Sequence, residues 1–307
     1  MAICVAECIS EMVQLFPAPN AIAEYTRHLI DEDFGWAIGI AYWLTYLSIF
    51  AAQNIMAASL SEYWGEKDGI WRPIVFYFAA NFGTLGINMV GARLFGWVEA
   101  IGGILKIALV ILITVVLAIV LADVNNEFQV GFRRNTPYAA SDTAAICYVI
   151  PIVTFGFIGI EAAEVISFEA APGSLQRPSK NIAYIASFLY LACMSTQVFS
   201  VPWTSRKLPD IYSGIGELNK RNEGGNESVT HILVVIAVRK WNKSSLDGLF
   251  DGAMIFSVIF ASNTALYIAS RTLYGMVIRM HNDSYLVGKL RHLSKVNRKT
   301  GCQSLLS

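Results

Sequence analysis

The apolar stretch from Pro151 to Glu161 combines the residue types best suited to bind a solute inside a membrane. Proline and glycine loosen a helix, and a carboxylate in mid-bilayer is costly enough to face a cavity or a partner. A break at residues 157–159 would expose peptide groups of the kind with which many secondary transporters hold a zwitterion or an ion. The alternative is a packing face, where Gly156 and Gly159 only allow a neighbouring helix to approach closely.

A second pair of charged residues lies in another apolar run. Lys106 follows Glu99 by seven residues, so the two side chains stand two turns apart on one face of a helix. Lys106 is too deep in this run to reach water with ease. It therefore either pairs with a carboxylate such as Glu161 or Glu164, or takes part in a proton relay. A purely structural ion pair remains an open alternative.

Neutral polar side chains occur in two further apolar runs. Ser262, Asn263 and Thr264 are consecutive, and hydroxyl side chains there can be satisfied by the backbone of their own helix. Gln53 and Asn54 share an earlier run, where one of them is expected to join neighbouring helices by a hydrogen bond. These residues are candidates for contacts between helices or with a solute.

The sequence carries no pattern typical of an enzyme, a metal site or a nucleic-acid binder. The four histidines lie outside the apolar runs, and the five cysteines have no ligand-like spacing. There is no nucleophile elbow and no glycine-rich phosphate loop. The net charge of zero lacks the basic footprint of a nucleic-acid-binding protein. We therefore expect no catalytic activity, no cofactor, no metal and no nucleic-acid partner.

The elements that carry these residues are long apolar segments. Apolar residues make up 55% of the 307 positions, and the mean hydropathy is +0.49. A membrane-spanning helix needs about 20 mostly apolar residues, and continuous apolar runs exclude the alternating pattern of a β-barrel. The sequence thus predicts an all-α polytopic membrane protein with a transmembrane domain over 1–278. Its helices are expected near 2–16, 34–62, 73–92, 95–122, 143–168, 182–203 and 247–278.

The distribution of basic residues predicts the orientation of the chain. Basic residues gather in the tail over 279–307, which the positive-inside rule places in the cytoplasm. The long polar loop over 204–246 is then extracellular. Asn226 opens a glycosylation sequon in this loop, where it could be modified, although sequons also arise by chance.

Several motifs, spread over residues 2–277, resemble the fungal amino-acid permeases of the amino acid-polyamine-organocation superfamily. They are Ser10-Glu-Met12 of the second helix, Phe34 to Gly39 of the third, Glu99 and Lys106 of the fifth, Phe155-Gly-Phe-Ile-Gly-Ile-Glu161 of the sixth, and Ser262 to Tyr274 of the eighth. The chain departs from the family's pattern at 169–183, and it has Gln53 where many relatives have a glutamate.

The resemblance implies a LeuT-like inverted-repeat helix bundle, of which this chain would hold about seven of twelve helices, with the first helix missing. It also implies the site. Phe155 would close over a bound amino acid, the broken backbone would hold the amino group, and Glu161 would sit beside it. The implied substrate-binding residues are Phe155, Gly156, Phe157, Ile158, Gly159, Glu161, Gln53, Ser262 and Asn263.

Coupling to an ion follows from the same resemblance. Lys106, with Ser262 and Asn263 opposite, would stand where related sodium-coupled transporters hold an ion, so the coupling ion would be a proton and Glu99 and Lys106 its carriers. The implied function is import of amino acids by proton symport across a membrane, expected to be the plasma membrane. The alternative is a permease remnant that cannot transport, or a nutrient sensor.

Overall fold

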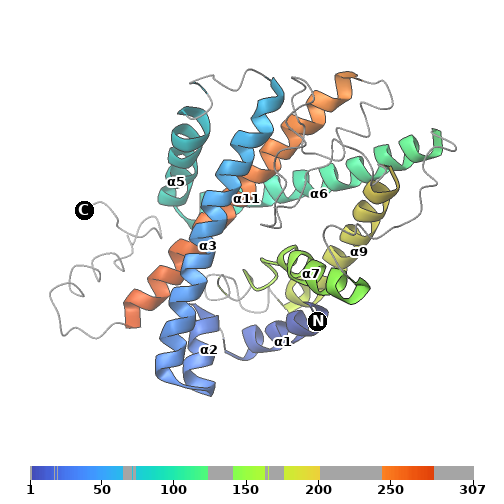
Figure 1. Cartoon of the computed structure of the whole chain (residues 1–307). Helices are drawn as coiled ribbons and strands as arrows, with labels where there is room; N and C mark the ends of the chain where they lie inside the picture. Colours follow the sequence, from blue (N-terminus) through green and yellow to red (C-terminus); the bar gives the residue numbers. More distant parts are fainter. Residues whose placement is uncertain are drawn as a thin grey trace.

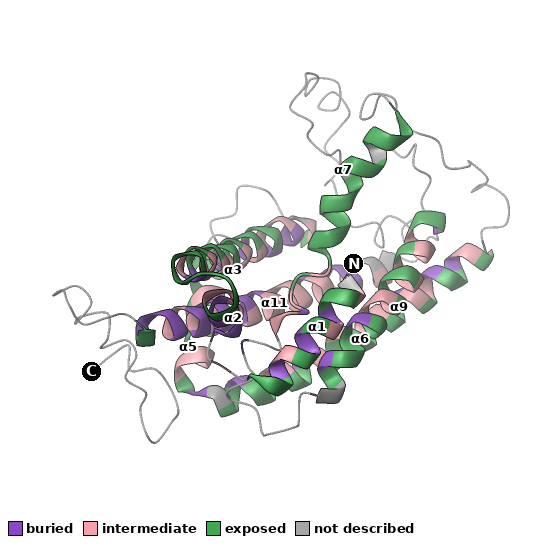
Figure 2. Cartoon of the chain, turned by 90° about the horizontal axis from the view of Figure 1, so that it is seen from below, coloured by how far each residue is buried: buried purple, intermediate pink, exposed green. Residues whose placement is uncertain are grey.

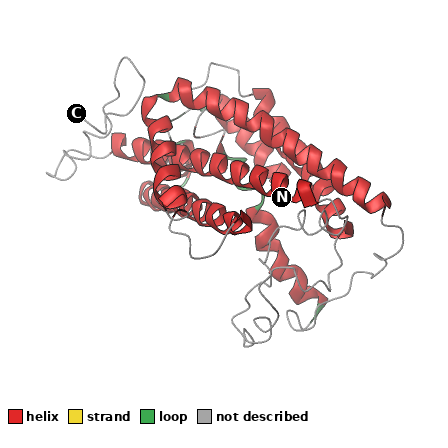
Figure 3. Cartoon of the chain, turned by 90° about the horizontal axis from the view of Figure 1, so that it is seen from above, coloured by secondary structure: helices red, strands yellow, loops and turns green. Residues whose placement is uncertain are grey.

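The computed structural model describes residues 2–16, 18, 20–64, 71, 74–123, 141–162, 165, 176–200 and 244–279. These residues form helices and turns, with no strand among them (Figure 3). The helices are α1 (Ala2–Leu15), α2 (Ala21–Leu29), α3 (Glu32–Leu60), the 3₁₀ turn η1 (Ser61–Trp64), the π-helix η2 (Ile74–Ala79), α5 (Ala80–Val90), α6 (Ala92–Asp123), α7 (Asp142–Phe155), α9 (Gln176–Ser200) and α11 (Ser244–Arg279). The prediction of an all-α polytopic membrane protein is confirmed.

Among the residues that the structure describes, four helices are long and apolar enough to cross a bilayer: Glu32–Leu60, Arg93–Ala122, Pro178–Ser200 and Gly248–Arg279. Two of the predicted spans are shorter as helices, for different reasons. The segment expected at 73–92 begins as a π-helix and continues as α5. The segment expected at 143–168 leaves the helical path after Phe155. The polar loop, including Asn226, and the tail after Arg279 lie outside the described residues.

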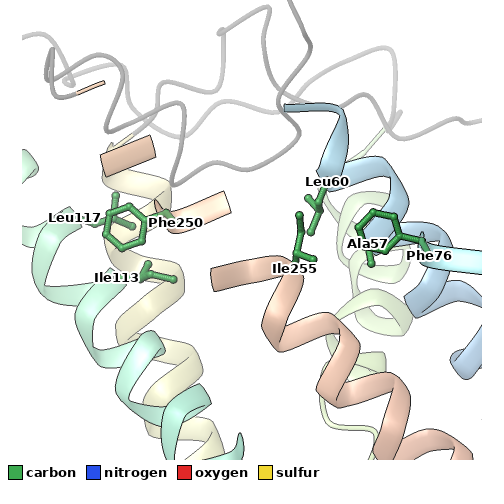
Figure 4. Close-up of a cluster of buried hydrophobic side chains, with 7 residues drawn as sticks. All are labelled: Ala57, Leu60, Phe76, Ile113, Leu117, Phe250 and Ile255. Carbon is green, nitrogen blue, oxygen red and sulfur yellow. The ribbon is translucent and has the colours of Figure 1, made fainter. Parts of the chain in front are cut away.

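The best-buried long helix in the described part of the chain is α11, which runs side by side with α3 along much of its length (Figure 1). Their apolar contacts continue onto α6 and η2 in one cluster (Figure 4). In this cluster Phe250 of α11 meets Leu117 of α6, and Ile255 of α11 lies beside Leu60 of α3. Such contacts between long helices are the main packing available in lipid, where no hydrophobic force drives helices together.

A second group of helices, α1, α7 and α9, packs away from α11, and α7 and α9 are the least buried of the three. α1 packs against α9, and α9 also runs along α6. Every described side chain of α7 is exposed, which Figure 2 shows as a green helix beside the partly buried α1 and α9. An apolar helix exposed in this way faces lipid or other protein. The chain therefore combines a packed pair of helices with an exposed helix, α7, whose C-terminal end leads into residues bonded to α3 and α9.

The short helix α2 was not predicted. It is amphipathic, carries Glu24, Arg27 and His28, and is far too short to span a bilayer. It turns back on α3 at Gly35, where a Cβ atom would lie 2.8 Å from the Cβ of Arg27. Asp31 caps α3 by accepting a 3.0 Å hydrogen bond from the amide of Asp33. Glycine and the cap thus fix a tight helical hairpin.

Candidate functional site

The helix α7 is interrupted where the sequence placed a break. After Phe155 the backbone bonds shift to a three-residue spacing, with the Phe157 amide 3.0 Å from the Thr154 carbonyl oxygen and the Ile158 amide 3.1 Å from that of Phe155. Gly159 has a φ of +101°, which L side chains rarely adopt. Residues 156–161 therefore form turns and do not continue the α-helix.

Glu161 folds back onto this interruption. Its Oε2 accepts a 3.0 Å hydrogen bond from the backbone amide of Gly159. Its Oε1 accepts a 2.6 Å hydrogen bond from the hydroxyl of Tyr46, which comes from α3. A short bond from a hydroxyl to a carboxylate oxygen is among the stronger hydrogen bonds in proteins. The carboxylate thus connects the interrupted backbone to the α3–α11 pair.

The other side of the interruption meets α9. The hydroxyl of Tyr190 donates a 2.5 Å hydrogen bond to the carbonyl oxygen of Gly156. The Tyr190 ring also lies 5.3 Å from the ring of Phe157, at an interplanar angle of 58°. Phe155, by contrast, is 59% exposed. One backbone acceptor and one backbone donor of the interruption are therefore held by side chains instead of by helix bonds.

Lys106 pairs with Glu99, at 3.2 Å between Nζ and Oε1. The expectation that it pairs with Glu161 is wrong, because the two oxygens of Glu161 are taken by Gly159 and Tyr46. Glu164 lies outside the described residues. The two-turn spacing on α6 explains the pair, since it places both side chains on one helix face. The Lys106 ammonium also lies 5.7 Å from the ring centroid of Phe260 on α11.

The polar residues of α11 bond to other helices. Ser262 Oγ accepts a 2.9 Å hydrogen bond from Asn54 Nδ2 of α3, and Asn263 Oδ1 accepts a 3.0 Å bond from Asn88 Nδ2 of α5. Of the three consecutive residues, Thr264 is satisfied within its own helix, by the Phe260 carbonyl. Of Gln53 and Asn54, Asn54 is therefore the residue that joins neighbouring helices.

Gln53, the other member of that pair, is half-buried. Its side chain forms no hydrogen bond within the part of the chain that the structure describes.

Sequence reasoning missed both tyrosines that hold the interruption. Tyr46 stands seven residues before Gln53, so the two lie on one face of α3, and this spacing is the signal that could have drawn attention to it. Tyr190 has no comparable signal, because its partner Gly156 is a backbone carbonyl 34 positions away.

Several membrane-length helices and one helix interrupted beside a carboxylate define a polytopic helical membrane protein with the architecture that secondary transporters use. The comparison with protein families makes the class specific. The chain belongs to the amino acid permease family, whose model matches residues 1–281. It is accordingly an integral membrane protein, and its family consists of transporters and not of enzymes.

Among curated proteins the chain is similar to fungal permeases. It is 21% identical over 279 residues to amino-acid permease GAP6 of Candida albicans, covering 89% of this chain and 46% of that protein. It is 23% identical over 273 residues to the tryptophan permease of Saccharomyces cerevisiae, covering 87% and 43%. The chain thus spans less than half the length of these relatives. No solved structure matches it.

Proposed function

We propose that this chain forms the middle of an amino-acid import pathway, with the interruption after Phe155 as the place where the solute binds. The observation that carries the proposal is the pairing of a backbone donor and a backbone acceptor with polar side chains at one helix break. A zwitterion offers the same two chemistries, a carboxylate for an amide and an ammonium for a carbonyl. The names of the similar fungal permeases support amino acids as the substrate class.

The residues at the break would have different roles in binding the amino acid. Glu161 supplies the negative charge that attracts the substrate's ammonium group, and the turn from Gly156 to Gly159, through Phe157 and Ile158, supplies the peptide groups. Phe155, which is largely exposed, is free to close over the solute. Gln53, Ser262 and Asn263 remain proposed contributors, although Ser262 Oγ and Asn263 Oδ1 already accept hydrogen bonds from Asn54 and Asn88.

We propose that the coupling ion is a proton and that the pair of Glu99 and Lys106 responds to it. Both side chains are only about a quarter exposed, at 26% and 23%. A charged pair at this depth is costly unless it is functional or well compensated. Import across the plasma membrane would use the inward proton gradient there.

The second candidate is a permease-like protein that binds amino acids without moving them, as a nutrient sensor or an inactive remnant. Binding without uptake is the behaviour that this candidate predicts.

The test is binding and uptake of labelled amino acids by the chain reconstituted in lipid vesicles. We expect saturable binding that Glu161→Gln reduces at least about ten-fold, as for loss of a charge-assisted contact. The matched control is Glu7→Gln, since Glu7 of α1 also accepts a hydrogen bond from a tyrosine, Tyr184 at 3.1 Å, but does not bond to the interruption. Unchanged binding in Glu161→Gln would disprove the site.

Uptake driven by an inward proton gradient separates the two candidates. Uptake that collapses with an uncoupler and with Lys106→Ala supports proton symport. Binding with no uptake under any gradient supports the sensor or remnant instead.

A further inference from the structure

Tyr46 is a buried residue whose polar atom reaches the interruption from another helix. Its side chain is only 3% exposed and packs in a cluster with Val165, next to the break, and with Ala265 and Ile268 of α11. Its ring also lies 4.9 Å from that of Tyr42, one turn earlier on α3. Packing on several sides fixes the ring, so the direction of its hydroxyl is set by α3 and α11.

Glu161 is less buried than Tyr46. Its side chain is half-buried and sits on residues that have left the helical path, so its rotamer is not set by a neighbouring turn. Two hydrogen bonds restrict it, one from the Gly159 amide and one from the Tyr46 hydroxyl. The bond from the Gly159 amide is local, so it moves together with the break. The bond from Tyr46 instead fixes the position of the carboxylate relative to α3.

We infer that Tyr46 is a positioning residue, which holds the Glu161 carboxylate on the Gly159 amide and so fixes where the negative charge meets a substrate's ammonium group. The inference rests on the proposed function for the substrate, but the positioning itself is a property of this chain. Supporting groups that lock a functional side chain within a fraction of an ångström are a general requirement of precise sites. Tyr46 fills this role from α3, far from Glu161 in the sequence.

The first test measures the Gly159 amide directly. Tyr46→Phe keeps the ring and removes only the hydroxyl, so the packing of the cluster is retained. Without that hydroxyl the carboxylate turns away, and we expect hydrogen exchange at Gly159 to become about ten-fold faster, a typical effect of losing one charge-assisted hydrogen bond. The control is Thr45→Val, which removes a neighbouring hydroxyl bonded only to the Ala41 carbonyl of its own helix. Equal exchange in Tyr46→Phe and the parent chain would overturn the inference.

The second test asks whether Tyr46 acts through Glu161. We expect Tyr46→Phe to weaken amino-acid binding about ten-fold in the parent chain, and to have no further effect in Glu161→Gln. Independent losses in the two backgrounds would instead mean that Tyr46 touches the solute itself, which also overturns the positioning role.

The two tests separate the inference from the function on which it builds. If the parent chain binds no amino acid, the proposed function fails, and the exchange rate at Gly159 still decides whether Tyr46 positions Glu161.

Discussion

Two regions of this chain carry polar groups into an apolar environment and satisfy them in opposite ways. The first is the α3–α5–α11 unit, in which continuous helices are joined by side-chain bonds from Asn54 to Ser262 and from Asn88 to Asn263. The second is the break at residues 156–161, in which the backbone itself loses helix bonds and borrows side chains for them. In the first region polar side chains hold helices together. In the second region a side chain that bonds to the backbone can be replaced by a polar group of a solute.

The difference indicates which region can bind a solute. The bond from Asn54 to Ser262 is buried between two helices that pack along much of their lengths. The bond from Tyr190 to the Gly156 carbonyl is exposed, so a side-chain rotation can free that carbonyl, whereas Tyr46 holds Glu161 on the Gly159 amide. The ammonium group of a solute can then replace the Tyr190 hydroxyl at the Gly156 carbonyl. A hydrogen-bond partner that a solute can replace is therefore found at the break, whereas those in the α3–α5–α11 unit are held by helix packing.

The largest predicted effect comes from forcing the break back toward an ordinary backbone. Gly159→Val places a branched side chain at a φ of +101°, where no neighbouring atom lies within 4 Å, so the cost is entirely that of backbone strain. Such strain costs about 3 kcal/mol at the upper end of its range, or more than about 100-fold in binding. We expect amino-acid binding to be lost while circular dichroism shows the helices retained.

The control for this change is Gly103→Val. Gly103 lies in α6 with ordinary helical geometry and also has no atom within 4 Å of its added Cβ. Valine there costs only a few tenths of a kcal/mol or less. If both variants bind equally well, the special backbone at Gly159 is not needed and the comparison between the two regions fails.

The fold was predictable to the extent that it depends on apolar length. The run over 95–122 is almost entirely apolar, with Glu99 and Lys106 its only charged residues, and it forms most of α6. The amphipathic α2 was missed because a search for membrane-length segments passes over a helix of nine residues. The π-helix η2 was missed as well, since its residues Ile74 to Ala79 read as ordinary apolar helix. Length and polarity therefore predict spans better than they predict hairpins or helix type.

The sequence predicted the residues of the break itself, but not the residues on other helices that bond to it. Proline, glycine and a carboxylate close together in the sequence indicated the interruption, because these residues act on their own helix. The partners Tyr46 and Tyr190 come from α3 and α9, and a single sequence does not show which residues of distant helices are in contact. The partner of Lys106 shows the same limit. The sequence placed Glu99 on the same helix face and also allowed Glu161 or Glu164 on another segment, and the structure shows the pair with Glu99.

A smaller effect is expected where α6 meets the α3–α5–α11 unit. A Cβ atom on Gly102 would lie 2.1 Å from the Phe260 ring of α11, whereas the same atom on Gly103 meets nothing within 4 Å. Overpacking typically costs about 1 to 3 kcal/mol. We expect Gly102→Ala to lower the melting temperature in detergent and Gly103→Ala to leave it equal or higher, since alanine favours a helix. Equal shifts in the two variants would show that α6 is not held against α11.

A still smaller loss of stability is expected when a hydrogen bond between the helices of the α3–α5–α11 unit is removed. Asn54→Ala removes the donor to Ser262 and to the Phe50 carbonyl. Hydrogen bonds between membrane helices average about 0.6 kcal/mol, with a maximum near 1.7. Thermal unfolding should therefore show a loss within this range, matched by Ser262→Ala, with no added loss in the double variant. A loss of amino-acid binding without any loss of stability would instead assign Asn54 to the solute pathway.

The smallest effect belongs to the ion pair that ties α2 to the end of the unit. Arg279 Nε lies 3.1 Å from Glu24 Oε1, but the arginine side chain is 47% exposed. Exposed pairs contribute about 0.2 to 1 kcal/mol and weaken with salt. We expect Arg279→Gln to lower stability by no more than this, and only at low ionic strength. A larger loss that persists at high salt would mean that α2 is an integral part of the packed region, and the boundary between the rigid unit and its surroundings would have to include it.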